Sequence, residues 1–107
     1  MLILLPPSEG KTAPTAGPAL DFSQLRYPQF NGLRKNLADE LIEISGRENA
    51  LDILQAGASV SETVFAQTQL YSLPCAPARD IYTGVLFEAL DFSHATPSEL
   101  AFAAEKY

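Results

Sequence analysis

The chain has 107 residues, of which 47% are hydrophobic and 19% are charged, values typical of one small globular domain and not of a disordered segment. Its 13 acidic and 7 basic residues give a formal charge of −6, which disfavours nucleic-acid binding by this stretch alone because neutralising phosphates requires clustered Lys and Arg. Cys75 and His94 are the only cysteine and histidine, which excludes an internal disulfide, and we expect no metal site and no cofactor.

The first expected element is a short buried strand over residues 1–5. This apolar run, MLILL, is bounded by prolines, as is typical of a strand covered on both faces. It is too short for a membrane span, and no positive charge precedes it as in a signal peptide. We therefore expect a cytoplasmic protein with no membrane partner.

The segment SEGKT (8–12) follows this run and invites comparison with phosphate-binding loops. That loop requires G-x-x-x-x-G-K-[ST], but Leu5 occupies the place of its first glycine. Pro6 and Pro7 would lie in the loop itself, and proline has no N–H to donate to a phosphate. SEGKT is therefore not a nucleotide-binding loop. Four of its residues remain candidates for an anion or ligand site, with a solvated turn as the alternative. These candidates are Ser8, Glu9, Lys11 and Thr12.

The middle of the chain is predicted to be helical. Apolar residues spaced by three and four positions predict a helix that starts at Asn31 and stops at Gly46. The residues of this stripe are Leu33, Leu37, Leu41 and Ile44. A second short helix is expected over residues 49–55.

A third helix is expected from Ser59, because Ser59-x-x-Glu62 matches a capping box. Helix, glycine turn and helix together form the outline of a helix-hairpin-helix, whose hairpin N–H groups can hold a DNA phosphate. The usual hairpin carries a second glycine, which is absent here, and no lysine lies nearby. An ordinary connection is the favoured interpretation. Gly57, Ala58 and Ser59 are weak DNA-binding candidates.

Towards the C-terminus a second short strand is expected over residues 80–82, followed by a short helix over VLFEAL (85–90). Tyr82, Thr83 and Gly84, at the end of this strand, are further ligand or anion-binding candidates. Thr96-Pro97-Ser98-Glu99 combines an N-cap, a first-turn proline and a glutamate at the third position, and predicts a last helix.

These elements predict an α/β fold, with α+β as the alternative, in which short buried strands flank a helical middle segment. Two strands make no stable sheet, so residues 1–107 are expected to be one N-terminal portion of a larger domain. If the two strands are parallel neighbours, their carboxyl ends meet at one edge of the sheet. Lys11 and Thr83 would then face a common cleft.

The run MLILL followed by PSEGKT, with DIYTG some seventy residues later, resembles the YaaA peroxide-stress family. The resemblance implies a longer cytosolic protein of the hydrogen-peroxide response that limits free intracellular iron. It also implies binding of double-stranded DNA through a positively charged cleft with a helix-hairpin-helix. Since this chain is acidic and its hairpin is degenerate, the basic surface is expected in the C-terminal half, with which this chain would associate.

No residue is assigned a catalytic role, and a protein that is not an enzyme is favoured. The alternative function is an enzyme or small-ligand-binding protein that acts on a phosphorylated or anionic compound at the SEGKT and YTG segments. Lys11 would pair with the anion, and Ser8 and Thr83 would donate hydrogen bonds to it. Glu9 would serve as a general base if burial raised its pKa.

Overall fold

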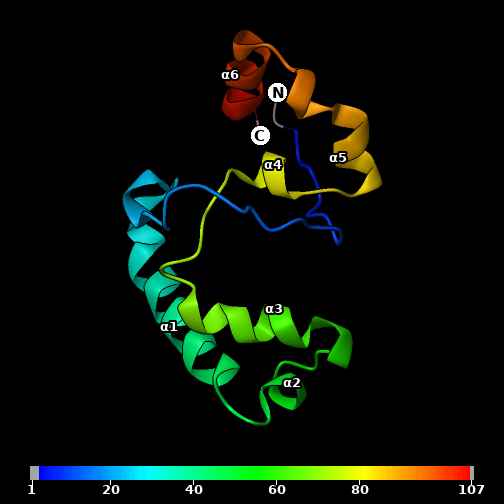
Figure 1. Cartoon of the computed structure of the whole chain (residues 1–107). Helices are drawn as coiled ribbons and strands as arrows, with labels where there is room; N and C mark the ends of the chain where they lie inside the picture. Colours follow the sequence, from blue (N-terminus) through cyan, green and yellow to red (C-terminus); the bar gives the residue numbers. More distant parts are fainter. Residues whose placement is uncertain (1–2, 107) are drawn as a thin grey trace. The chain divides into compact units, whose positions relative to one another are not determined.

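The computed structural model describes residues 3–106, and all regular elements in that range are helical (Figure 1). Short 3-10 turns connect the α-helices. The α-helices are α1 (Asn31–Ser45), α2 (Ala50–Ile53), α3 (Ser61–Ala66), α4 (Ala78–Ile81), α5 (Val85–Leu90) and α6 (Pro97–Lys106). The 3-10 turns are η1 (Phe22–Gln24), η2 (Pro28–Phe30), η3 (Ala58–Val60), η4 (Gln67–Gln69) and η5 (Phe92–His94).

The chain divides into two compact units. The terminal unit consists of Met1–Gly17 with Cys75–Tyr107, and the middle unit of Pro18–Pro74. Most contacts of each residue are therefore made within its own unit, and the two units are described separately.

The expected α/β class is wrong, because residues 3–106 contain no strand and only one isolated antiparallel bridge, between Lys11 and Tyr82. Of the expected first strand, residues 1–2 lie outside the described residues. Residues 3–5 have no regular structure, and Leu4 is 82% exposed. An apolar run without neighbouring strands has no ladder to join.

The expected strand over residues 80–82 is also wrong, because α4 covers Ala78–Ile81 and only Tyr82 has an extended backbone. Pro77 precedes this helix, and Ala78 and Arg79 are good helix formers. The amide of Tyr82 donates to the carbonyl of Ala78 at 2.9 Å, which closes the last helical turn. Local helix formation therefore replaces the strand.

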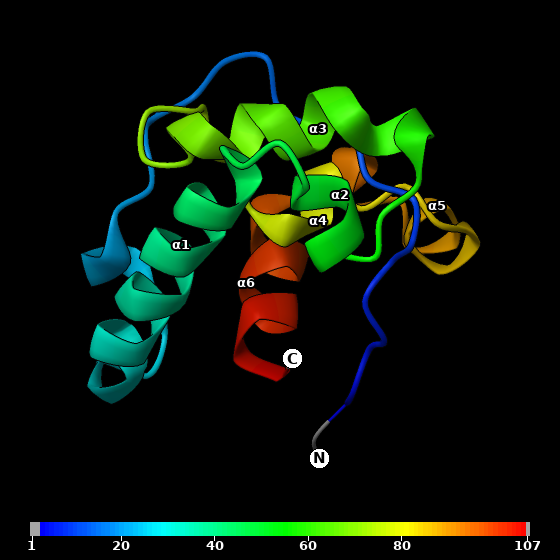
Figure 2. The same ribbon diagram turned by 90° about the horizontal axis from the view of Figure 1, so that it is seen from below.

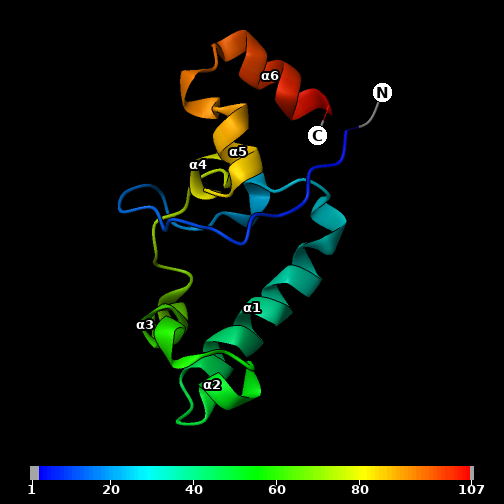
Figure 3. The ribbon, with the colours of Figure 1, turned by 90° about the vertical axis from the view of Figure 1, so that its right-hand side faces the viewer.

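In the middle unit, the first predicted helix is confirmed as α1, which ends at Gly46. The helix α2 and the turn η4 lie against α1, and α3 packs against α2 and η4 (Figure 3). The buried side chains at this junction include Ala50 and Val64, together with Ser45, whose hydroxyl donates to the Gln67 side chain at 3.0 Å. Only half of the expected apolar stripe is packed inside the unit. Leu41 and Ile44 are half-buried, while Leu33 and Leu37 are exposed.

The capping box expected at Ser59 is not formed. Ser59 lies inside η3, where the amide of Val60 donates to the carbonyl of Gly57 at 3.1 Å. The helix α3 begins only at Ser61, with Val60 as its N-cap residue and no side-chain cap hydrogen bond. A 3-10 turn thus takes the place of the cap.

In the terminal unit, the last two predicted helices are confirmed as α5 and α6, connected through η5 (Figures 1 and 2). The start of α6 forms the expected capping box. The Glu99 carboxylate accepts from the Thr96 amide at 2.7 Å, and the Glu99 amide donates to the Thr96 hydroxyl at 3.3 Å. The bond from the Thr96 amide, followed by one from the Thr96 hydroxyl to the same carboxylate at 2.8 Å, lowers the pKa of Glu99.

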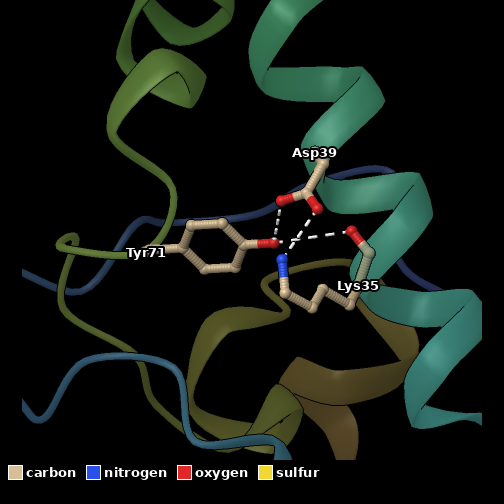
Figure 4. A network of polar contacts seen from close by, with 3 residues as sticks. All are labelled: Lys35, Asp39 and Tyr71. Atoms are coloured by element: carbon tan, nitrogen blue, oxygen red, sulfur yellow. Dashed lines mark hydrogen bonds and ion pairs between the residues drawn. The ribbon is translucent and has the colours of Figure 1, made fainter.

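A polar network in the middle unit ties α1 to the segment after η4 (Figure 4). Asp39 accepts hydrogen bonds from the Lys35 ammonium at 2.8 Å and from the Tyr71 hydroxyl at 2.6 Å. The bond from Lys35, followed by that from Tyr71, lowers the pKa of Asp39. The bond to Asp39 is also the main reason why the pKa values of Lys35 and Tyr71 are raised.

This network predicts a pH-dependent contribution to stability. A lowered carboxylate pKa stabilises the fold above the unfolded value, near 3.8, and this stabilisation is lost as the pH falls through the folded value. The raised pKa values of Tyr71 and Lys35 stabilise it below their unfolded values, 10.0 and 10.5, and this contribution is lost as the pH rises through the folded values. We therefore expect Asp39→Asn to lower the melting temperature most near neutral pH, and progressively less below about pH 4 and above about pH 10.

Thermal melts from pH 3 to 11 measure this difference. Glu40→Gln removes one exposed carboxylate from the same helix and controls for the change in net charge. A difference between wild type and Asp39→Asn that is independent of pH would contradict the prediction.

Candidate functional site

The segments SEGKT and YTG lie side by side in the terminal unit (Figures 1 and 3). Their backbones run antiparallel through the Lys11–Tyr82 bridge. The amide of Thr12 donates to the carbonyl of Ile81 at 2.8 Å, and the amide of Thr83 donates to the carbonyl of Gly10 at 3.0 Å. We call this paired region, residues 8–12 and 82–84, the SEGKT–YTG joint.

Ser8 is the buried centre of the joint, with only 6% of its surface exposed. Its hydroxyl donates to the carbonyl of Gly10 at 2.7 Å and accepts from the amide of Gly84 at 2.7 Å. The hydroxyl hydrogen that was expected to bind an anion is therefore used within the protein. Ser8 holds the two segments together and fixes the first turn of α5, because Gly84 is the N-cap residue of that helix.

Two glycines allow the segments to approach closely. A Cβ atom at Gly84 would lie 2.5 Å from the Ser8 hydroxyl oxygen, and one at Gly10 would lie 2.8 Å from the Thr83 hydroxyl oxygen. A side chain at Gly84 would therefore displace the hydrogen-bonded Ser8 hydroxyl, whereas one at Gly10 would require only the Thr83 side chain to move. Gly10 was not a candidate from the sequence, although its place inside the conspicuous SEGKT segment was the signal that marked it.

Aromatic contacts support Lys11, the exposed cation of the joint. The Lys11 ammonium lies 5.6 Å from the centre of the Tyr82 ring. The Tyr82 ring packs edge-on against Phe87 of α5, with 4.8 Å between ring centres. Cation–π attraction of this kind is weak at an exposed position, about 0.5–1 kcal/mol, so it orients the lysine without excluding an anion.

Glu9 and Thr83 line two different hollows, which share Phe87. Glu9 is exposed and lines a hollow of about 350 Å³ together with Gly84 and Phe87. Thr83 lines another of about 640 Å³ beside Arg79 and other residues. Of the residues that the structure describes, those lining these hollows do not include Lys11. Lys11 and Thr83 thus belong to paired segments, and a common cleft for the two side chains stays a prediction.

The weak DNA-binding candidates Gly57, Ala58 and Ser59 lie in the middle unit, in the exposed connection between α2 and α3. The helices on either side contribute acidic Asp52 and Glu62. Negative charge at both flanks opposes the approach of a phosphate.

Two basic side chains of α1 and its C-terminal turn are engaged in ion pairs. Lys35 pairs with Asp39 at 2.8 Å, and Arg47 pairs with Glu43 at 2.5 Å. Because each of these cations is paired with a carboxylate, the two ion pairs add little positive electrostatic potential near residues 57–59.

Between residues 3 and 106, no group of three or more His, Cys, Asp or Glu side chains is placed to hold a metal ion. In the same range, none of the helices has the length and apolar character needed to cross a bilayer.

Comparison with known proteins places the chain among longer relatives. A UPF0246 protein of Corynebacterium efficiens is 39% identical over 100 residues, which cover 94% of this chain and 40% of the relative. A UPF0246 protein of Streptomyces coelicolor is 38% identical over 95 residues, covering 87% of this chain and 36% of the relative. The chain thus spans about two fifths of the length of these curated relatives. No solved structure matches it.

The match to a family description is more extensive. The family described as peroxide stress protein YaaA matches residues 1–107, a range that includes both segments of the joint. With this match and relatives above one-third identity, the chain belongs to the YaaA peroxide-stress protein family.

Proposed function

We propose that this chain acts within a cytoplasmic protein of the peroxide response that binds double-stranded DNA and limits free intracellular iron. The observation that supports it is the family match over residues 1–107. The chemistry is coherent, because ferrous iron reduces peroxide to hydroxyl radical, which attacks DNA. A protein at the DNA that keeps iron scarce would suppress this damage at its source.

The DNA contact itself is proposed to lie outside this chain. The net charge of −6 repels a polyanion, and the candidate hairpin at Gly57, Ala58 and Ser59 is flanked by acidic residues. In this proposal the chain contributes the SEGKT–YTG joint as scaffold, and the phosphate contacts come from the part of the relatives that the match does not cover.

Salt-dependent binding to duplex DNA tests this proposal. Fluorescence anisotropy would be measured with the full-length Corynebacterium efficiens relative and with this chain, from low to physiological salt. We expect the relative to bind with an affinity that falls steeply with salt, as counterion release requires, and this chain alone not to bind. Absence of binding by the relative at low salt would end the DNA proposal. Unchanged chelatable iron in peroxide-treated cells with and without the relative would end the iron proposal.

A second candidate function is binding of a phosphorylated or anionic small molecule at the joint. It is favoured by the exposed Lys11 ammonium, which lies over the Tyr82 ring and has a positive charge to offer an anion. Ligand-induced thermal shifts over a panel of nucleotides and sugar phosphates test this function. We expect any shift to be lost in Lys11→Ala and largely kept in Lys11→Arg, which preserves the charge. A panel that produces no shift with the wild-type chain would contradict it.

A further inference from the structure

An exposed apolar stripe runs from Phe30, at the end of η2, along the N-terminal half of α1, and the Phe30 ring lies 6.5 Å from the Tyr27 ring. Phe30, Leu33 and Leu37 are 50%, 59% and 62% exposed. Their spacing of three and four residues places them on one face of the helix. Single exposed apolar residues are common on protein surfaces, but three large ones in one row form a candidate interaction surface.

The apolar stripe continues into a part of the same helix face that is already packed within the middle unit. Leu41 and Ile44 extend the same face towards the C-terminal end of α1, where they are half-buried among the elements of the middle unit. A different side of α1 carries Lys35 and Asp39, which bind Tyr71 (Figure 4). Other parts of the middle unit thus contact α1 on two sides. On the apolar side, only the C-terminal part, with Leu41 and Ile44, is covered.

The lengths of the relatives indicate what covers the first half. In the Corynebacterium efficiens relative, 100 matched residues make up 40% of the chain, so it has about 250 residues, of which about 150 lie outside the match. A second copy of this chain is a weaker occupant, because each copy carries a charge of −6 and the two would repel.

We propose that the stripe formed by Phe30, Leu33 and Leu37 is the docking surface for the portion of a family protein that lies outside the matched region. The docked segment presents an apolar surface, which extends the packed face of Leu41 and Ile44 along the whole of α1. Burying two leucine side chains on association strengthens binding on the order of 100-fold or more, so these residues dominate the contact.

Co-expression tests the proposal. A tagged form of this chain would be produced together with the unmatched portion of the Corynebacterium efficiens relative, and the retained portion quantified after purification. Leu33→Gln with Leu37→Gln removes the apolar side chains while keeping charge and helix propensity. Asn36→Gln, an exposed position of α1 outside the stripe, is the matched control.

We expect the wild-type chain and Asn36→Gln to retain the portion equally, and the double variant to retain at least tenfold less. The melting temperature of the double variant alone should match that of the wild type. Four results would each overturn the proposal. They are no retention by the wild type, equal retention by the double variant, a lower melting temperature of the double variant alone, and a wild-type homodimer that the double variant makes monomeric. The third would show that the stripe is already covered within the chain, and the fourth that a second copy covers it.

Discussion

Replacing Gly84 with alanine is expected to destabilise the terminal unit by roughly 2–3 kcal/mol. The new Cβ would lie 2.5 Å from the hydroxyl oxygen of Ser8, which is buried and holds hydrogen bonds to Gly10 and Gly84. Ser8 cannot move aside without breaking these bonds, and the Gly84 amide would then lose its partner at the start of α5. Amide hydrogen exchange of residues 80–94 measures the change, because it reports on this unit separately.

Gly32→Ala is the matched control for this substitution. A Cβ atom at Gly32, in the first turn of α1, meets no atom within 4 Å. Alanine also has the higher helix propensity, so stability should stay the same or rise by up to about 1 kcal/mol. Protection of residues 80–94 should be unchanged. Equal effects of the two substitutions would show that close approach at the joint is not the cause.

A double-mutant cycle tests whether the Ser8 hydroxyl is the group that the new alanine side chain meets. Ser8→Ala alone leaves the Gly84 amide unpaired and should cost about 1–3 kcal/mol. In the double variant the clash is gone, so the combined cost should fall short of the sum by 1 kcal/mol or more. Strict additivity would contradict the geometry of the joint.

Periodicity and start signals in the sequence predict the helices well where local information suffices. The 3.6-residue pattern gives α1 together with its stop at Gly46, and Thr96 with Glu99 marks the start of α6. The strands fail because a short apolar run becomes a strand only when a neighbour pairs with it. Residues 3–5 have no such neighbour in this structure, and residues 78–81 close a helical turn of their own.

The structure of the SEGKT–YTG joint also depends on contacts between residues far apart in the sequence. The sequence predicts that SEGKT and YTG meet, but as the ends of parallel strands, whereas the structure brings them together antiparallel through a single bridge. The hydrogen bond between Ser8 and Gly84 spans 76 residues. No local pattern encodes such a contact, so the direction of the pairing and the internal role of Ser8 emerge only in three dimensions.

The second large effect is expected at Val64, which lies in α3 at the centre of the middle unit. Val64 is only 7% exposed, and few other side chains of the described residues are buried to that degree. Val64→Ala leaves a cavity where α3 meets the rest of the unit, and should cost about 2 kcal/mol, offset by at most about 0.5 kcal/mol of helix propensity. Because a unit of this size is marginally stable, the melting temperature of its transition should fall by about 10 °C.

Val60→Ala provides the comparison, since it removes the same atoms four residues earlier from a side chain that is 41% exposed. That substitution should cost less than about 0.5 kcal/mol, because water already covers much of the valine. Calorimetric melts of the two variants and the wild type measure both effects. If Val60→Ala proved as damaging as Val64→Ala, the core of the middle unit would have to be centred on the connection before α3 and not on the buried face of that helix.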